Sequence, residues 1–423
     1  REGSPDAPPT NWQSKFGGNA WEYVPHLKKW YLHLFDVSQA DLNWDNPRVR
    51  EELKEVIRFW KAKGVKGFRF DVVNLISKPD VFADDDKGDG RRFYTDGPRV
   101  HRYLQELVRD TGIEDMVTVG EMSSTSLDNC IRYSRPEDRE LSMCFNFHHL
   151  KVDYRDGDKW KLMEPDLVRL KQLFMEWQEG MAQEHGWNAL FWCNHDQPRA
   201  ISRFGDDGKY WKESAKMLAT IIHMFRGTPY VYQGEELGMT NPHYEDISQY
   251  RDVESINYYR ILTEQGSTGE EALKVLAARS RDNGRTPMQW DGSRYAGFSQ
   301  GEPWIGIPQN HSYINVETEA ADSDSILNYY KRLIALRKEH KVISEGEIEF
   351  IYREHPQVLA YRRTYQGQEL VVLANMTGRE AVLGDSPELG GLRQLIGSYK
   401  EEACRQPLKQ LRPYECRVYM GTM

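Results

Sequence analysis

Three acidic residues in the first half of the chain stand where their side chains could hydrolyse a glycosidic bond. Asp71 ends the segment GFRFD, Glu121 ends VTVGE, and Asp196 lies within WCNHDQP. The reaction needs two carboxyl groups, because one attacks the anomeric carbon or activates water while the other protonates the leaving oxygen. A third carboxylate can hold the sugar hydroxyls. Any one of the three alone fits a strand-end carboxylate paired with Arg or Lys, whereas the three together indicate a hydrolytic site.

Arg69 adds an electrostatic argument to this assignment. It lies two residues before Asp71, so both side chains point to the same side of a strand with a period of two residues. A guanidinium there keeps the Asp71 carboxylate ionised and directed at the anomeric carbon. Glu121 needs a raised pKa instead, because a general acid must hold its proton. The ionised Asp71 carboxylate nearby in a closed pocket would raise it.

The elements that must position these residues alternate between helix and strand. Asn46 as N-cap, Pro47 at the first helical position and Gly64 beyond the end predict a helix over 47–63. A strand over 65–71 follows, and further apolar runs predict more strands and helices. The strands are expected at 116–120, 144–147, 189–193 and 229–232, and the amphipathic helical segments at 100–108 and 215–225. This rhythm predicts an α/β fold, a (β/α) barrel whose active site lies at the carboxyl ends of the strands.

The pattern changes near residue 340, where short strands follow one another with no helix between them. They are predicted at 348–352, 358–364, 369–374 and 416–420 and indicate a small antiparallel β-sandwich. We therefore expect the catalytic barrel to span 41–340 and the sandwich to span 341–423.

Composition limits the remaining possibilities. A formal net charge of −9 leaves no broad basic face for nucleic acid. No apolar run approaches the roughly 20 residues needed to span a bilayer. Five cysteines, at positions 130, 144, 193, 404 and 416, are scattered and form no C-x-x-C pair, which favours a reducing compartment. We predict a cytoplasmic monomer whose partner is a small molecule.

The motifs also resemble those of a known family. GFRFD, VGE at 119–121 and NHD at 194–196 look like signature segments of the α-amylase family, glycoside hydrolase family 13, in matching order. The resemblance implies an (β/α)8 TIM barrel with Asp71 as nucleophile, Glu121 as acid/base and Asp196 as transition-state stabiliser. It places Arg69, His195 and Arg199 among the substrate-binding residues. QADLNWDNP at 39–47, TPYVYQGEE at 228–236 and RTPMQW at 285–290 are similar to the oligo-1,6-glucosidase branch of the family.

Two further segments narrow the expected substrate. VVNLISKPD at 72–80 and FNFHHLKVD at 145–153 are similar to members of that branch that hydrolyse trehalose 6-phosphate. The resemblance implies release of glucose and glucose 6-phosphate with retention and without a required cofactor. A basic run follows the sixth barrel strand, where the leaving sugar should lie, and its charges suit a phosphate dianion. It contains His148, His149, Lys151, Lys159 and Lys161.

One departure from the family pattern concerns the first residues. The family barrel begins with three strands that precede an inserted domain, whereas residues 1–40 here resemble the end of that insertion. We therefore expect the first three barrel strands to be absent from this sequence. The family's usual calcium site lies in that absent part, so calcium binding is possible and the metal ligands are unknown.

Two alternatives stay open. An oligo-1,6-glucosidase acting on neutral sugars would need no phosphate pocket around Lys151. A non-catalytic relative, such as the ectodomain of an amino-acid transporter heavy subunit, would keep the barrel as a binding module. The presence of all three acids and the absence of a membrane span in the sequence count against the second alternative.

Overall fold

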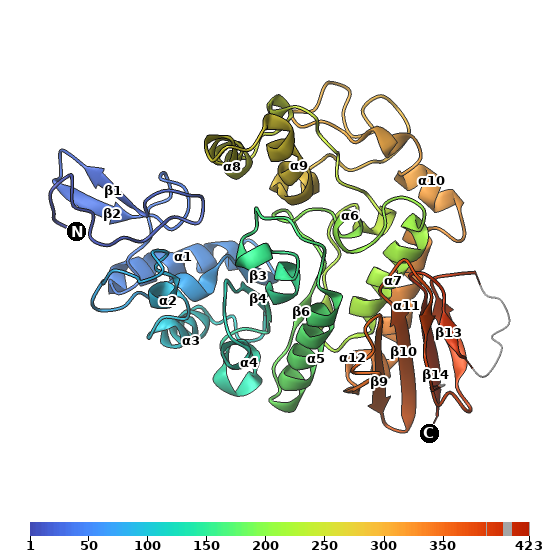
Figure 1. The fold of residues 1–423 in the computed structure, drawn as a ribbon. Coiled ribbons are helices and arrows are strands. Elements are labelled where there is room, and N and C mark those ends of the chain that lie inside the picture. The colour runs from blue at the N-terminus through green and yellow to red at the C-terminus, as the bar shows by residue number, and fades with distance from the viewer. Residues whose placement is uncertain (386, 401–407, 423) are drawn as a thin grey trace. The chain divides into compact units, whose positions relative to one another are not determined.

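The computed structural model describes residues 1–385, 387–400 and 408–422. The chain divides into two compact units (Figure 1). Unit 1 contains Arg1–Phe147 and Gln183–Asn188, and unit 2 contains His148–Ala182 and Ala189–Met423. Asp71 and Glu121 therefore belong to unit 1, and Asp196 belongs to unit 2. The domain boundaries expected at residues 40 and 340 remain predictions.

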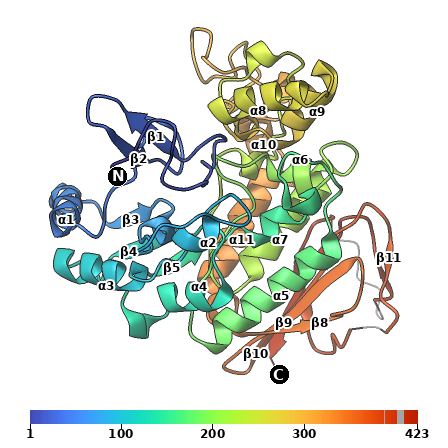
Figure 2. The ribbon, with the colours of Figure 1, turned by 60° about the vertical axis from the view of Figure 1, so that its left-hand side comes forward.

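Unit 1 is built on three parallel strands in the order β3-β4-β5 (Figure 2). They span Gly67–Phe70, Val117–Glu121 and Met143–Phe145, close to the ranges predicted from the sequence. A separate antiparallel hairpin, β1 (Trp21–Val24) and β2 (Lys29–Leu32), precedes them. The helices of unit 1 are α1 (Pro47–Ala62), α2 (Arg91–Tyr94), α3 (Val100–Thr111) and α4 (Leu127–Ser134), with short 3-10 turns η1 (Val73–Leu75) and η2 (Pro136–Asp138).

Helix α1 has the ends that the sequence predicts. The Asn46 side chain accepts a hydrogen bond from the Arg48 amide at 3.0 Å, and Pro47 takes the first helical position. Gly64, just beyond the helix, has φ = 92°, a conformation that glycine adopts without steric cost. The chain can therefore turn there and enter β3.

The first part of unit 2 consists mainly of helices and contains two further parallel strands. These strands, β6 (Ala189–Leu190) and β7 (Thr228–Pro229), are shorter than predicted. After Leu190 the chain leaves the sheet, and the Phe191 carbonyl contacts a ring nitrogen of His149 at 2.8 Å instead of a neighbouring strand. The helices are α5 (Leu167–Gln183), α6 (Ala200–Phe204), α7 (Trp211–Met224), α8 (Val253–Glu264), α9 (Gly269–Arg279), α10 (Val316–Ala321), α11 (Ile326–Glu339) and α12 (Lys341–Ser344).

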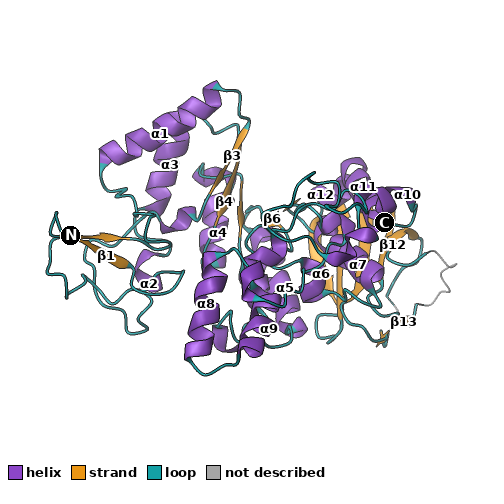
Figure 3. Ribbon diagram, turned by 90° about the horizontal axis from the view of Figure 1, so that it is seen from above, coloured by secondary structure: helices purple, strands orange, loops and turns teal. Residues whose placement is uncertain are grey.

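Short 3-10 turns join these helices in unit 2. They are η3 (His148–Lys151), η4 (Arg155–Gly157), η5 (Glu235–Leu237), η6 (Ile247–Gln249), η7 (Arg281–Gly284) and η8 (Gln309–Ser312). Helices α8 and α9 lie side by side (Figure 3). The turn η7 begins two residues after α9 ends, so the α8–α9 pair fixes where this turn starts.

The C-terminal part of unit 2 contains an antiparallel sheet in the order β12-β14-β10-β9-β8 and a two-stranded sheet of β11 and β13. Buried side chains from both sheets share one core, including Val371 and Tyr419 from the first and Ala381 and Leu411 from the second. The predicted sandwich is thus confirmed. Its strands are β8 (Glu347–Ile351), β9 (Val358–Tyr365), β10 (Gln368–Asn375), β11 (Ala381–Val382), β12 (Arg393–Gly397), β13 (Gln410–Leu411) and β14 (Cys416–Thr422).

Polar side chains join this sandwich to the helices of unit 2. Lys171 on α5 donates from Nζ to the carbonyls of Tyr352, His355 and Val358 at 2.8, 2.6 and 3.0 Å. Arg363 on β9 is fully buried and donates to the Met224 carbonyl at the end of α7, at 2.7 Å. Burial lowers the pKa of Lys171 to about 8. These contacts give two buried cations, Lys171 and Arg363, their hydrogen-bond acceptors.

The cysteines whose positions the structure describes, Cys130, Cys144, Cys193 and Cys416, are free and buried. Cys404 lies outside the described residues. Burial raises the pKa of the Cys193 and Cys416 thiols, so these side chains pack as small apolar groups.

Candidate active site

Asp71 and Glu121 stand at the ends of two neighbouring parallel strands. The register pairs Phe70 on β3 with Gly120 on β4, so the two acidic residues are next in line on adjacent strands. Arg69 contacts both: its Nη1 lies 3.1 Å from Asp71 Oδ1, and its Nη2 contacts Glu121 Oε2. The Asp71 side chain is 71% exposed and that of Glu121 only 12%. One carboxylate is thus open to an incoming molecule, while the other is enclosed beside it.

The glycines in these two motifs are required by close packing. A Cβ atom on Gly67 would lie 2.6 Å from the Val117 carbonyl oxygen of the neighbouring strand. On Gly120 it would lie 2.5 Å from Met122 Cε and 2.6 Å from Leu141 Cδ1. A larger residue at 67 would push β3 away from β4, whereas one at 120 would displace the Met122 and Leu141 side chains.

Val72 directly after Asp71 has a strained backbone. Its φ of 41° and ψ of 38° fall in the left-handed region, which β-branched residues rarely adopt. Such strain costs about 1–3 kcal/mol and persists only where the surrounding structure holds it. It turns the chain sharply out of β3, so the turn η1 begins at once and Asp71 stays at the strand end.

Asn74 ties together the loops that follow the two strands, a role that the sequence did not indicate. It is fully buried, and its amide donates to the Ser123 carbonyl at 2.9 Å and to Asp96 Oδ1 at 3.0 Å. Its side-chain oxygen accepts from the Ser123 amide at 2.9 Å. Ser123 lies two residues after Glu121, so Asn74 fixes the exits of β3 and β4 relative to each other.

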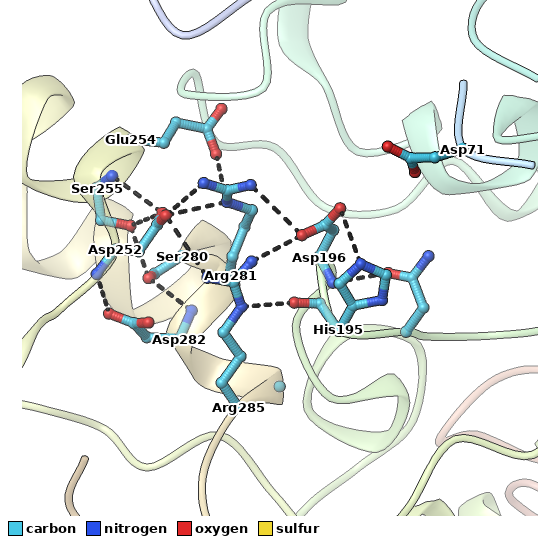
Figure 4. Close-up of polar contacts among 12 residues, drawn as sticks. Asp71, His195, Asp196, Asp252, Glu254, Ser255, Ser280, Arg281, Asp282 and Arg285 are labelled. Carbon is cyan, nitrogen blue, oxygen red and sulfur yellow. Dashed lines mark hydrogen bonds and ion pairs between the residues drawn. The ribbon is translucent and has the colours of Figure 1, made fainter. Parts of the chain in front are cut away.

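In unit 2, Asp196 lies in a turn that follows β6 and contacts two arginines and a histidine (Figure 4). Its Oδ1 lies 2.7 Å from Arg285 Nη2 and 3.4 Å from Arg281 Nη1, and its Oδ2 lies 3.5 Å from His195 Nε2. The Asn194 side chain accepts from the Asp196 amide at 2.8 Å and shapes the turn. Arg281 begins the turn η7 and Arg285 follows its last residue, and the sequence did not indicate that either one contacts Asp196.

Arg199 is buried rather than directed at solvent. Its guanidinium donates to the Gln233 carbonyl at 2.6 Å and to Thr286 Oγ1 at 3.3 Å. Burial lowers the pKa of Arg199, while the acidic groups near it act in the opposite direction. These contacts hold the Gln233 and Thr286 segments beside the Asp196 turn.

The basic run after β5 divides into buried and exposed members. His149 is buried against Phe174, Phe191 and Trp192. His148 stacks on Trp177, with ring centroids 5.1 Å apart. Lys159 lies 2.8 Å from Glu254 Oε2, whereas Lys151 is exposed and Lys161 is 56% exposed. Lys161 also lies 3.9 Å from Asp156 Oδ2. The structure therefore separates two exposed lysines from a less exposed lysine and two packed histidines.

Comparison with known proteins agrees with these motifs. The family model described as "Alpha amylase, catalytic domain" matches residues 1–346. The chain belongs to the alpha-amylase family. The trehalose-6-phosphate hydrolase of Escherichia coli (strain K12) is 53% identical over 417 residues, which cover 98% of this chain and 75% of that protein. The oligo-1,6-glucosidase of Halalkalibacterium halodurans is 43% identical over a region that covers 100% of this chain and 77% of that protein.

The solved structures give the same family fold. A crystal structure of Bacillus licheniformis trehalose-6-phosphate hydrolase superimposes with a TM-score of 0.94 at 52% identity, covering 100% of this chain and 77% of that one. The family resemblance inferred from GFRFD, VGE and NHD is therefore confirmed, and so is the expected fold class of a TIM barrel with a C-terminal antiparallel domain. Like these relatives, the chain is a glycoside hydrolase of the alpha-amylase family.

Within 1–385, 387–400 and 408–422, no group of three or more His, Cys, Asp or Glu side chains is arranged to hold a metal ion. No helix in those ranges is both long and apolar enough to cross a bilayer. Calcium binding remains a prediction.

The buried His149 gives a prediction for the stability of this alpha-amylase family chain. Burial lowers the pKa of His149 to about 3, only partly offset by the contact with the Phe191 carbonyl. The folded protein keeps the ring neutral, whereas the unfolded chain takes up a proton below about pH 6.5. The free energy of unfolding therefore falls as the pH is lowered from about 6.5 toward 3, by about 2 kcal/mol at pH 5.

The variant His149→Gln tests this term, because the glutamine amide can still donate to the carbonyl but does not titrate in this range. Urea denaturation at pH 7 and pH 5 should show wild type losing about 2 kcal/mol more than the variant. Equal losses in the two proteins would contradict the prediction.

Proposed function

We propose that the chain hydrolyses the α,α-1,1 bond of trehalose 6-phosphate and releases glucose and glucose 6-phosphate with retention. The observation that carries the proposal is Arg69, whose guanidinium contacts Asp71 and Glu121 at the ends of adjacent strands. Two carboxyl groups held together at one site are what glycoside hydrolysis requires. The choice of substrate is supported by the 53% and 51% identical trehalose-6-phosphate hydrolases of Escherichia coli and Bacillus subtilis.

The proposed reaction has two steps. Asp71 attacks the anomeric carbon of the unphosphorylated glucosyl unit, while Glu121 gives its proton to the bridging oxygen and glucose 6-phosphate leaves. The glucosyl unit is then bound as an ester of Asp71. In the second step Glu121 takes a proton from water, whose oxygen attacks the anomeric carbon, and α-glucose is released as the Asp71 carboxylate re-forms.

The other residues have supporting roles in this proposal. Arg69 positions Asp71, and the open carboxylate can reach a sugar that enters the site. Asp196 and His195 hold the hydroxyls of the glucosyl unit and stabilise the oxocarbenium-like transition state. Arg199 holds the turn that carries them through its contacts with Gln233 and Thr286. The proposed place of action is the cytoplasm, since a phosphate dianion does not cross a bilayer unaided.

Product analysis tests the reaction directly. Proton NMR of the reaction should show α-glucose as the first-formed anomer, with glucose 6-phosphate released in equal amount. First-formed β-glucose would contradict the proposed mechanism. Faster hydrolysis of isomaltose than of trehalose 6-phosphate would instead favour the oligo-1,6-glucosidase alternative, which the 43% identical Halalkalibacterium halodurans relative supports.

The phosphate is proposed to bind the lysines of the basic run, with Lys151 and Lys161 as the exposed members. Replacing either by alanine should raise KM for trehalose 6-phosphate and lower kcat/KM by about 10- to 150-fold. This corresponds to about 1.5–3 kcal/mol, the usual range for a hydrogen bond to a charged group. Lys159 is less exposed than the other two lysines and lies 2.8 Å from Glu254 Oε2, so Lys159→Ala is expected to have the smallest selective effect of the three.

A neutral substrate supplies the matched control for these lysine variants. Hydrolysis of 4-nitrophenyl α-glucoside should stay within about twofold of wild type, because that substrate has no phosphate to lose contact with. Added salt should weaken the phosphorylated substrate more than the neutral one. Loss on both substrates would indicate damage to the fold or the catalytic centre. If none of the three variants discriminates, the phosphate binds elsewhere.

A further inference from the structure

Arg281 is the cation beside Asp196 that is most firmly held by other parts of unit 2. Its side chain is only 13% exposed. Figure 4 shows its guanidinium between Asp196 on one side and the carboxylates of Asp252 and Glu254 on the other. Nη1 lies 3.4 Å from Asp196 Oδ1, Nη2 lies 2.5 Å from Asp252 Oδ1, and Nε lies 3.4 Å from Glu254 Oε2. The planar fork of an arginine suits this arrangement, which a lysine cannot reproduce.

Asp252 anchors this guanidinium to the start of helix α8. Its side chain is 1% exposed, and its Oδ2 caps the helix by accepting from the Ser255 amide at 3.1 Å and the Ser255 hydroxyl at 3.0 Å. Its Oδ1 remains for Arg281. Burial would disfavour the charged form, but the hydrogen bonds and charge of Arg281 outweigh it and lower the pKa of Asp252. A charged, immobile carboxylate therefore fixes Arg281.

Charges of opposite sign alternate through the cluster. Lys159, Arg281 and Arg285 face Glu254, Asp252 and Asp196, each within 4 Å of at least one partner. Removing one member leaves a half-buried partner without its counter-charge, which is costly. Asp196 is thus held by a network whose far side is buried, not by exposed groups that could swing away.

We propose that Arg281 is a positioning residue that fixes the Asp196 carboxylate for catalysis, with Asp252 holding Arg281 in place. The inference rests on the role proposed above for Asp196. Arg281 acts through Asp196 and not by contact with the reacting atoms. Arg285 lies 3.7 Å from Asp252 Oδ1, beyond hydrogen-bond distance, so Asp252 acts mainly through Arg281.

The test compares kcat and KM of Arg281→Met, Arg281→Lys, Asp252→Asn and the double variant Arg281→Met/Asp252→Asn, with 4-nitrophenyl α-glucoside as substrate. Arg281→Met should lower kcat by about 10- to 100-fold with KM within about twofold, because a misplaced Asp196 loses its transition-state contacts. Arg281→Lys should restore part of the loss. Asp252→Asn keeps a capping oxygen but removes the charge and should lower kcat by about 3- to 10-fold.

The double variant should be no slower than Arg281→Met alone, because Asp252 has no further effect once Arg281 is gone. Thr268→Ala is the matched structural control: Thr268 caps α9 next to α8, and its loss should lower the melting temperature without changing kcat.

The outcomes separate this inference from the proposed function. If Asp196→Asn is nearly inactive while Arg281→Met and Asp252→Asn keep kcat within twofold of wild type, the positioning role is wrong and the proposed function stands. Equal falls in kcat for Thr268→Ala and Asp252→Asn would also overturn the inference, since helix stability alone would explain both. If Asp196→Asn keeps kcat, the proposed role of Asp196 fails, and this inference fails with it.

Discussion

Replacement of Asp71 by asparagine is expected to reduce turnover of trehalose 6-phosphate by about 10⁴-fold or more while the protein stays folded. The amide cannot form the glycosyl ester, so the two-step route is lost. A fall of 10⁴ corresponds to about 5.5 kcal/mol of activation free energy. Asp71 is largely exposed and its ion pair with Arg69 lies at the surface, so the substitution should cost little stability.

Two measurements check the role of Asp71. Release of glucose 6-phosphate gives kcat, and thermal unfolding followed by circular dichroism confirms the fold. The variant Asp71→Gly with added azide should form β-glucosyl azide, because the small anion attacks from the face that the carboxylate has left. Appreciable turnover by Asp71→Asn, or no azide product from Asp71→Gly, would contradict the assignment.

Replacement of Glu121 by glutamine should give a loss that depends on the leaving group. Hydrolysis of trehalose 6-phosphate should fall by about 10²–10⁴-fold, the usual contribution of general acid catalysis. The leaving sugar alkoxide needs a proton, whereas 4-nitrophenolate leaves without one. For 4-nitrophenyl α-glucoside, kcat/KM should therefore stay within about tenfold of wild type.

The second step gives a separate readout for Glu121, since the same residue must activate the water. Stopped-flow measurements should show a burst of about one equivalent of nitrophenol, followed by slow turnover, as the glycosyl ester accumulates. Azide should accelerate turnover and form α-glucosyl azide, opposite in configuration to the product of Asp71→Gly. Equal losses on both substrates without a burst would contradict the acid/base role.

The sequence predicted the Asp71 and Glu121 pair because the information is local. Arg69 and Asp71 are two residues apart at the end of β3, and Gly67, which allows β3 to approach β4 closely, lies within the same short motif. The ends of α1 were likewise predictable, since Asn46, Pro47 and Gly64 determine them through neighbouring backbone groups. Local chemistry therefore gave the family and the strand-end positions.

Contacts between distant segments could not be predicted in this way. Arg281 is 85 residues from Asp196 and 29 from Asp252, and no local pattern links the three. His149 stands in a run of basic residues whose charges were expected to suit a phosphate, yet its ring packs among Phe174, Phe191 and Trp192. The apolar stretch at 189–193 predicted a longer strand than β6, because apolar residues also line the buried turn that follows it.

The three carbonyls bound by Lys171 bear on how this chain can be recombined with its relatives. Lys171 belongs to a helix that follows the basic run, whereas Tyr352, His355 and Val358 lie between and at the start of sandwich strands. Arg363 and Tyr361 reach in the opposite direction, from the sandwich to the carbonyls of Met224 and Ile221 on α7. The C-terminal sandwich therefore cannot be exchanged independently of the helices that it contacts. A chimaera that takes the sandwich from another glucosidase also needs compatible partners on α5 and α7. Otherwise the buried cation Lys171 or the incoming equivalent of Arg363 loses its carbonyl acceptors.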